Sequence, residues 1–266
     1  MRKWVFGLVG WTLVLAGHID TVSVPSPAMK RDMPAIVVTP ENSGGPFPVV
    51  YLLHGYSGSY QDWNRKADLA AESDRYGVIL VCPEGGYNSW YLDSPVDPTS
   101  QYESWIVKDL IPWVDHQYST RGNREYRAIT GLSMGGHGAL YLAIRHPDLF
   151  SAAGSMSGGV DLRFSTKRWE ISEKLGPYED FPERWKQNSI VGMIEDIPAD
   201  SLALFIDCGV NDFFIEINRT LHRKLLERNL PHEYIERPGG HSWSYWTHAL
   251  DYHLLFFRQI FDARDR

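Results

Sequence analysis

Short apolar runs alternate along the chain with longer stretches in which apolar residues recur at helical spacing. The runs are nearly continuous rather than alternating, and most end at glycine or proline; they cover residues 35–38, 48–53, 78–82, 126–130, 152–155, 202–208 and 233–236. Continuous apolar strands are typical of a sheet that is buried on both faces. The pattern therefore predicts a mainly parallel central sheet.

The stretches between these runs have the spacing of amphipathic helices, with candidates at residues 64–76, 103–117, 133–145, 214–228 and 244–262. Alternating strands and helices predict an α/β fold with helices on both faces of the sheet. Residues 161–200 differ, because they mix charges, aromatics and prolines with weak periodicity. We interpret this segment as a lid or insertion, with an ordinary surface excursion as the alternative.

The N-terminus has the composition of an export signal. Arg2 and Lys3 precede an apolar run over residues 4–16, which is too short to span a bilayer comfortably. We predict a signal peptide over residues 1–20, cleavage near residues 17–21, and one domain over residues 21–266. The protein is then secreted or periplasmic, without stable membrane insertion after signal removal. A retained membrane anchor is the alternative.

Charge and cysteine content narrow the class of protein. The 266 residues carry a formal net charge of −7, and Lys and Arg form no dense cluster, which disfavours a nucleic-acid partner. Cys82 and Cys208 end two predicted strands that lie several strands apart, so we expect two buried thiols rather than a disulfide. No metal-binding or phosphate-binding motif is present, and we predict no metal and no cofactor.

The strongest chemical motif is the run Gly131-Leu-Ser133-Met-Gly135, which lies between a predicted strand and a predicted helix. This G-x-S-x-G pattern is typical of the nucleophile elbow of α/β-hydrolases. Side chains two residues before and after the serine would collide with neighbouring backbone, so glycine is needed there. We predict Ser133 as a nucleophile.

A serine nucleophile needs a base and an acid that orients the base. In this fold they follow the serine in the order acid, then histidine, on loops after later strands. Asp212 follows the run 202–208, and His241 follows the run 233–236. Glu216 is the main alternative acid. Asp207 lies inside a strand, and we expect it to be structural.

The oxyanion formed in acyl transfer requires preorganised hydrogen-bond donors. One predicted donor is the backbone N–H of Met134, directly after the nucleophile. The other is the N–H of Tyr56, in the loop after the run 48–53. His54 is expected to brace that loop.

These motifs resemble the esterase D-like family, which includes tributyrin, feruloyl and acetyl-xylan esterases, S-formylglutathione hydrolases and mycolyltransferases. The likeness runs from about residue 22 to residue 257, with landmarks at residues 52–55, 62–63, 88–91, 131–136 and 239–243. The resemblance implies the α/β-hydrolase fold, a Ser133–Asp212–His241 triad, and an oxyanion hole from Tyr56 and Met134. Mycolyltransferases use a glutamate as the acid, which keeps the alternative acid open.

Aromatic residues near the predicted site are candidates for substrate contact: Tyr87, Trp90, Tyr91, Tyr102 and Trp243. We select Trp90 and Trp243 as substrate-binding residues, with core packing as the alternative. The predicted function is serine carboxylic-ester hydrolysis, removing acetyl or hydroxycinnamoyl groups from carbohydrate or small alcohol esters. An acyltransferase to a sugar or lipid alcohol, and a catalytically silent carbohydrate-binding protein, are the competing hypotheses.

Overall fold

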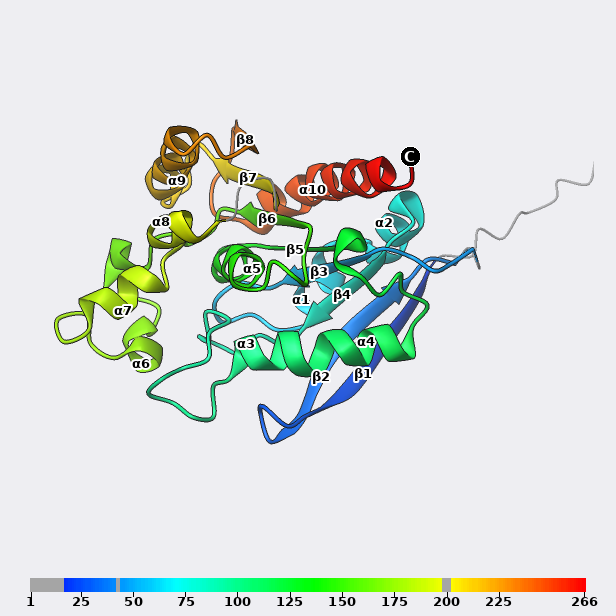
Figure 1. The fold of residues 1–266 in the computed structure, drawn as a ribbon, viewed down its shortest axis with the longest axis horizontal. Coiled ribbons are helices and arrows are strands. Elements are labelled where there is room, and N and C mark those ends of the chain that lie inside the picture. The colour runs from blue at the N-terminus through cyan, green and yellow to red at the C-terminus, as the bar shows by residue number, and fades with distance from the viewer. Residues whose placement is uncertain (1–16, 42–43, 198–201) are drawn as a thin grey trace, which may run out of the picture.

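The computed structural model describes residues 17–41, 44–197 and 202–266. An eight-stranded sheet runs through the molecule in the order β1-β2-β4-β3-β5-β6-β7-β8 (Figure 1). The strands β3 to β8 are parallel, and β1 and β2 form an antiparallel hairpin at one edge. The strands are β1 (His18–Ser26), β2 (Arg31–Thr39), β3 (Val49–Leu53), β4 (Ile79–Pro83), β5 (Arg127–Gly131), β6 (Ala152–Met156), β7 (Ala203–Gly209) and β8 (His232–Arg237).

Each predicted strand is present, and most of its ends lie within two residues of the predicted ones. Strand β1 was not predicted. This edge strand alternates between exposed and covered positions along its first part, so it lacks the continuous apolar run of the inner strands. It also begins within the region assigned to signal cleavage. The predicted signal peptide itself lies mostly outside the described residues.

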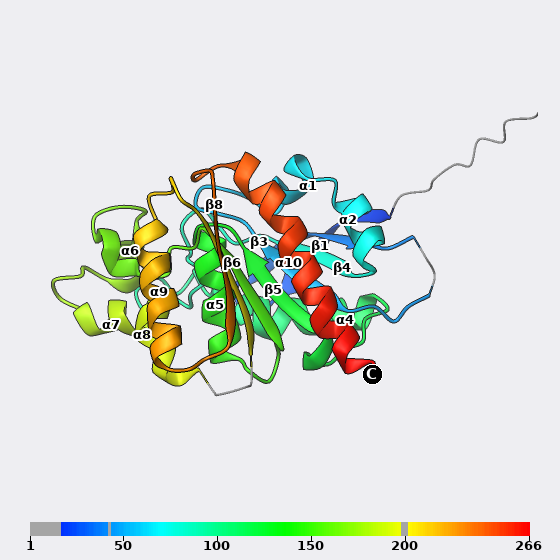
Figure 2. The ribbon, with the colours of Figure 1, turned by 90° about the horizontal axis from the view of Figure 1, so that it is seen from above.

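Helices cover both faces of the sheet. One face packs against α5 (Met134–Arg145), α9 (Ile215–Glu227) and the helical stretch formed by α3 (Tyr102–Ser104), the π-helical η1 (Trp105–Leu110) and α4 (Ile111–Gln117). The other face packs against α1 (Asp62–Lys66), α2 (Leu69–Tyr76) and α10 (Trp243–Arg264), and Figure 2 shows α10 crossing the sheet beside α2. The α/β prediction, with helices on both faces, is confirmed.

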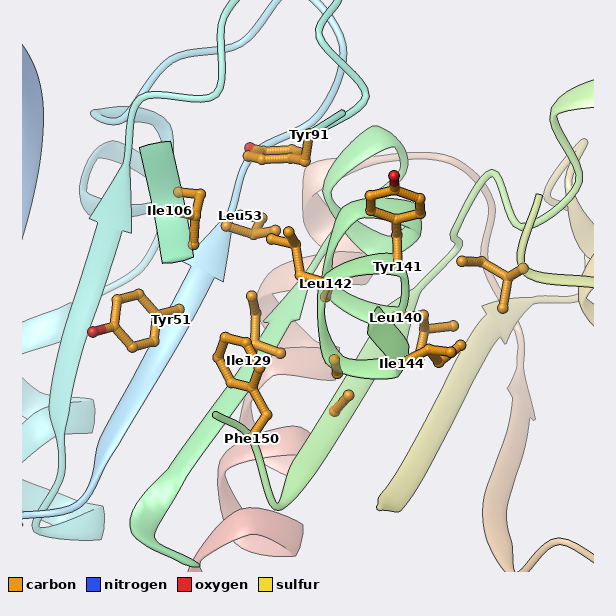
Figure 3. Packing of buried hydrophobic residues seen from close by; sticks show 14 of the residues in the cluster. Tyr51, Leu53, Tyr91, Ile106, Ile129, Leu140, Tyr141, Leu142, Ile144 and Phe150 are labelled. Atoms are coloured by element: carbon orange, nitrogen blue, oxygen red, sulfur yellow. The ribbon is translucent and has the colours of Figure 1, made fainter. Parts of the chain in front are cut away.

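Helix α5, which follows the nucleophile turn, lies at the centre of the larger core. Its side chains Leu140, Leu142 and Ile144 are buried and lie near Ile129 of β5 and Phe150 (Figure 3). Burying a large aliphatic side chain contributes roughly 1.5–3 kcal/mol. The turn that carries Ser133 is therefore held between two well-packed elements.

Two predicted helices differ in detail from the structure. The helix predicted over 64–76 is divided, because Ala67 adopts an extended backbone and Asp68 caps a new helix by accepting a hydrogen bond from the Ala71 N–H. The helix predicted over 103–117 contains η1, a stretch of wider π-helical turns.

Residues 161–197 form short helices beyond the end of the sheet, next to α9 (Figure 1). These are η3 (Leu162–Ser165), α6 (Ile171–Leu175), α7 (Pro182–Gln187), α8 (Ile190–Met193) and η4 (Ile194–Asp196). Trp185 is fully buried, and its indole N–H donates to the Gly176 carbonyl. The segment thus has a small core of its own, and its role as a lid stays a prediction.

Cys82 and Cys208 are buried free thiols on β4 and β7, with three strands between them. Burial raises the pKa of both thiols, which keeps them protonated. Among the described helices, none combines the length and apolar character that crossing a bilayer requires.

His253 of α10 is fully buried beneath the sheet and predicts a specific acid sensitivity. Burial first, and then the charge of Arg237, lower the pKa of its imidazole to about 3; its ring also faces the Thr130 hydroxyl and the Phe205 ring. An unfolded histidine has a pKa near 6.5, so below that pH the unfolded chain binds a proton that the folded chain excludes. Folding stability is therefore lost as the pH falls from about 6.5 towards 3.

We expect this group to remove roughly 2 kcal/mol of unfolding free energy between pH 7 and pH 5. Urea unfolding of the wild type and of His253→Gln at both pH values measures the effect, and the variant should lose less stability on acidification. His116→Gln, at an exposed histidine, is the matched control. Equal pH dependence in the wild type and His253→Gln would contradict the assignment.

Candidate active site

Ser133 lies at the turn between β5 and α5 with φ 55° and ψ −115°, a left-handed conformation that non-glycine residues rarely adopt. Its N–H donates to the Met156 carbonyl at 2.9 Å. A Cβ on Gly131 would lie 2.6 Å from the Gly135 carbonyl oxygen, and a Cβ on Gly135 would lie 2.5 Å from the Leu53 carbonyl oxygen. The steric need for both glycines, predicted from the sequence, is confirmed.

The loops that carry Asp212 and His241 follow the adjacent parallel strands β7 and β8, so both leave the same edge of the sheet. They touch through their backbones, since the Asn211 N–H donates to the Gly239 carbonyl at 2.9 Å. A Cβ on Gly209 would lie 2.5 Å from that same carbonyl oxygen. Glycine is thus required for the close approach that brings the acid and the base together.

Three side chains form a continuous chain of hydrogen bonds at this edge. The Nδ1 of His241 lies 2.8 Å from Oδ2 of Asp212, and its Nε2 lies 2.9 Å from Oγ of Ser133. Because an ionised carboxylate only accepts, Nδ1 carries the proton and Nε2 accepts from the serine hydroxyl. The other oxygen of Asp212 accepts from the Phe214 N–H at 2.8 Å, which fixes the carboxylate.

The loop after β3 contributes Gly55 and Tyr56 to the same pocket as Ser133. As expected, His54 holds this loop in place through hydrogen bonds. Its Nδ1 donates to the Gly55 carbonyl at 2.8 Å, and its Nε2 accepts from the Gly85 N–H at 2.8 Å. Burial lowers the pKa of this imidazole, which keeps it neutral and able to play both roles. Tyr56 lies in this loop, while Met134 is the first residue of α5, where N–H groups have no partner in their own helix.

A pocket of about 200 Å³ opens beside the serine. Tyr56 and Trp243, both singled out from the sequence, lie on its wall. The complete lining is Gly55, Tyr56, Gly58, Asp62, Leu132, Ser133, Trp169, Phe213, His241, Trp243 and Trp246.

Trp90 is not among the residues that line this pocket. Its selection as a substrate-binding residue is therefore corrected. Its backbone φ is 53° and that of Tyr91 is 59°, and both side chains are buried. The Trp90 indole N–H donates to the Trp169 carbonyl at 3.3 Å, and its ring packs against His137. Trp90 therefore supports the pocket from the interior.

Comparison with known proteins identifies the family. The sequence model of the family described as "Putative esterase" matches residues 26–257. The chain belongs to this esterase family. An acetyl esterase from Caldicellulosiruptor saccharolyticus is 29% identical over 210 residues, which cover 74% of this chain and 78% of that protein.

Two further similar proteins are named for other acyl reactions, one as an acyltransferase and one as a ferulic acid esterase. The diacylglycerol acyltransferase/mycolyltransferase Ag85B of Mycolicibacterium smegmatis is 27% identical over 277 residues, covering 87% of this chain and 82% of that protein. A solved structure of a ferulic acid esterase is 28% identical with a TM-score of 0.79, covering 92% of this chain and 99% of that one. The α/β-hydrolase fold expected from the sequence is confirmed by this match.

Three aromatic residues of the esterase pocket wall were not predicted from the sequence: Trp169, Phe213 and Trp246. Trp169 comes from the segment of short helices, and its ring stacks on Phe213 at 6.0 Å between centroids. Phe213 contacts the His241 ring at 4.2 Å, and Trp246 meets that ring edge-on at 4.8 Å. The position of Phe213 next to Asp212 in the chain was the one local signal that could have pointed to it.

The alternative carboxylates lie elsewhere in the esterase. Glu216 is exposed and forms an ion pair with Arg219 at 2.7 Å. Asp207 is buried in β7, where it pairs with Arg237 and accepts from the Tyr245 hydroxyl, which agrees with a structural role. Across the part of the chain that the structure describes, no group of three His, Cys, Asp or Glu residues could hold a metal ion.

Proposed function

We propose that this esterase hydrolyses carboxylic esters through an acyl-enzyme on Ser133, with His241 as general base and Asp212 as the acid that orients it. The hydrogen-bonded chain of these three side chains, with links of 2.9 and 2.8 Å, carries the proposal. A serine hydroxyl is a weak nucleophile at neutral pH, and an imidazole within hydrogen-bond reach relieves that weakness by accepting its proton.

In the acylation step, Oγ of Ser133 attacks the ester carbonyl while Nε2 of His241 takes the hydroxyl proton. The carbonyl oxygen becomes an oxyanion that the N–H groups of Met134 and Tyr56 stabilise. The bond to the alcohol oxygen then breaks, and the imidazolium gives its proton to the leaving alcohol. Asp212 stays ionised and stabilises the positive charge on the ring.

In the deacylation step, water takes the place of the alcohol. His241 removes one proton from the water as its oxygen attacks the acyl carbon, and the proton then returns to Oγ of Ser133 as the carboxylic acid leaves. Because the imidazole ring is held by Asp212 on one side, the same nitrogen serves both steps.

We further propose an acetyl or hydroxycinnamoyl group as the acyl part and a carbohydrate or small alcohol as the other part. The aromatic walls support this substrate class, since flat rings pack well against phenolic and sugar rings. The names of two relatives, an acetyl esterase and a ferulic acid esterase, agree with it.

A panel of p-nitrophenyl acetate, p-nitrophenyl butyrate, methyl ferulate and acetylated xylan tests this proposal, with Trp169→Ala beside the wild type. Loss of an aromatic contact should lower kcat/KM on methyl ferulate about fivefold, with less than a twofold change on p-nitrophenyl acetate. Phe164→Ala, at an exposed aromatic outside the pocket lining, is the control. Equal losses on both substrates would argue that Trp169 is structural.

Acyl transfer to an alcohol is the second candidate, favoured by the 27% identity to Ag85B. The two reactions share the acyl-enzyme and differ in whether water or an alcohol attacks it. Product analysis with glucose present during turnover of the acetate ester separates them, because a transferase yields acetylated sugar in place of free acetate.

A further inference from the structure

A second pocket, of about 340 Å³, opens near the candidate active site and has mainly polar walls. Three separate parts of the chain build it: the β1–β2 hairpin, the long connection from β4 to α3 together with the first residue of α3, and α6. Its lining is Met29, Arg31, Gly86, Tyr87, Asn88, Ser89, Asp97, Thr99, Ser100, Tyr102 and Lys174.

The two pockets are separated by a pair of tyrosine side chains in contact with each other. Tyr56 lines the pocket beside the serine and Tyr87 lines the polar pocket, and their rings meet at 4.9 Å between centroids. The Ser57 N–H donates to the Tyr87 carbonyl at 2.7 Å, which ties the loop after β3 to the loop after β4. Tyr87 is 57% exposed, so its ring lies at the rim of the polar pocket, in contact with the Tyr56 ring of the other pocket.

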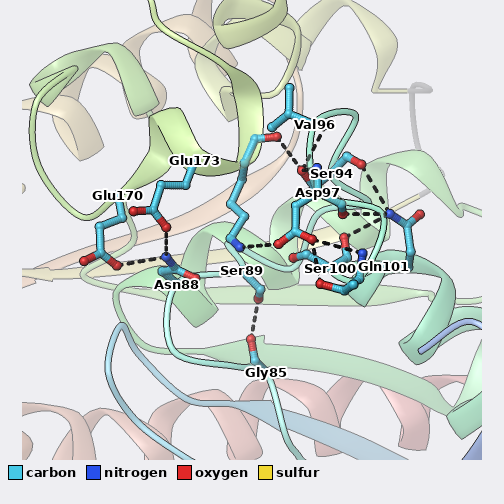
Figure 4. A network of polar contacts seen from close by, with 12 residues as sticks. Gly85, Asn88, Ser89, Ser94, Val96, Asp97, Ser100, Gln101, Glu170 and Glu173 are labelled. Carbon is cyan, nitrogen blue, oxygen red and sulfur yellow. Dashed lines mark hydrogen bonds and ion pairs between the residues drawn. The ribbon is translucent and has the colours of Figure 1, made fainter. Parts of the chain in front are cut away.

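A second connection runs through the segment of short helices. The Asn88 amide donates to the carboxylates of Glu170 and Glu173, as Figure 4 shows. Glu170 directly follows Trp169, which lines the pocket beside the serine. A ligand that occupies both pockets would therefore pass over the contact between the loop after β3 and the loop after β4.

The floor of the polar pocket is held in place by its own hydrogen bonds. Nζ of Lys174 lies 2.9 Å from Oδ2 of Asp97, while the other oxygen of Asp97 accepts from the N–H and hydroxyl of Thr99. The Thr99 and Lys174 contacts lower the pKa of the Asp97 carboxyl to about 2. These charged groups are thus paired before any ligand arrives.

Other polar groups of the pocket retain unused hydrogen-bonding capacity. Ser100 is 3% exposed, and its buried hydroxyl has no hydrogen-bond partner among the described residues. A buried hydroxyl without a partner is costly, which points to a ligand or solvent group that completes it. Arg31 makes no ion pair among the described residues, and its guanidinium lies on the wall beside the buried Tyr102.

We propose that the polar pocket binds a sugar ring in the alcohol part of the ester, through Arg31, Ser100 and the exposed ring of Tyr87. This inference rests on the proposed esterase function. Sugar hydroxyls both donate and accept hydrogen bonds. They therefore match a pocket wall that offers a guanidinium, hydroxyl groups, and the Lys174 and Asn88 side chains that carboxylates hold in place. The Tyr87 ring offers an apolar face on which the sugar ring packs.

Kinetics on two acetates that differ only in the alcohol test the proposal. We expect Arg31→Ala to lower kcat/KM about tenfold on acetylated xylotriose, and Ser100→Ala to lower it about fivefold, because each removes hydrogen bonds to the sugar. Both should change kcat/KM on p-nitrophenyl acetate less than twofold. Arg223→Ala, at an exposed arginine of α9, is the control for loss of a surface charge.

Binding to an inactive variant tests the pocket separately from catalysis. Saturation-transfer NMR of Ser133→Ala with xylotriose and cellotriose should show contact, which the added Arg31→Ala change weakens. Absence of binding by either sugar at millimolar concentration would overturn the inference, as would equal losses by Arg31→Ala on both esters. A wild type that hydrolyses no ester, while sugars still bind, would reject the proposed function alone.

Discussion

Replacing Ser133 by alanine should lower kcat on p-nitrophenyl acetate by roughly 10⁶-fold, the size of effect that loss of a triad serine has in a serine protease. The hydroxyl that lies 2.9 Å from Nε2 of His241 is the group that would bond to the acyl carbon, and alanine removes it. The left-handed backbone strains alanine no more than serine, so the fold should be preserved.

The measurement combines stopped-flow kinetics with labelling by a fluorophosphonate, followed by peptide mass spectrometry. The wild type should carry the label on the peptide that contains Ser133, and the variant should carry none. Ser172→Ala, at an exposed serine of α6, should keep both activity and labelling. Near-wild-type turnover by Ser133→Ala would sink the proposed acyl-enzyme.

Replacing Asp212 by asparagine should lower kcat by about 10⁴-fold with little change in KM. The carboxylate accepts from Nδ1 of His241 at 2.8 Å, which leaves Nε2 without a proton. An amide side chain in the same place can instead donate to Nδ1, and the ring then carries its proton on Nε2, where it cannot act as a base. The hydrogen bond from the Phe214 N–H is compatible with the amide oxygen, so the loop should keep its shape.

Glu216→Gln is the matched variant, because it removes the rival carboxylate and leaves Asp212 intact. Its ion pair with Arg219 is exposed, and exposed pairs contribute little to stability, so we expect activity within about twofold of the wild type. The reverse ranking, with Glu216→Gln inactive and Asp212→Asn active, would transfer the acid role to the glutamate.

The residues that the structure brings together as the sequence predicted follow either from the sterics of one turn or from the order of the parallel strands. Gly131 and Gly135 follow from steric contacts within a single turn, and that turn lies between a strand and a helix with strong apolar patterns. Asp212 and His241 were found because parallel strands bring their following loops to one edge. The chain order of acid and histidine that is typical of this fold, together with the parallel strands, thus predicted both loops beside the serine.

The residues that were missed or misassigned depend on contacts between distant loops. Trp169 reaches the pocket because it stacks on Phe213, more than forty positions away in the chain, and weak periodicity gave no sign of it. Trp90 was expected at the pocket, yet two successive left-handed residues turn it into the core. An aromatic side chain satisfies either environment, so its residue type alone does not decide between them.

The left-handed backbone at Ser133 has a consequence for heat resistance. Glycine adopts such a conformation without steric cost, whereas a residue with a Cβ is held there at roughly 1–3 kcal/mol. At position 133 the folded chain would therefore accommodate glycine at a lower free-energy cost than serine. A screen that ranks variants by melting temperature alone would tend to enrich glycine here and discard the hydroxyl, so thermostabilisation of this protein has to be scored together with turnover.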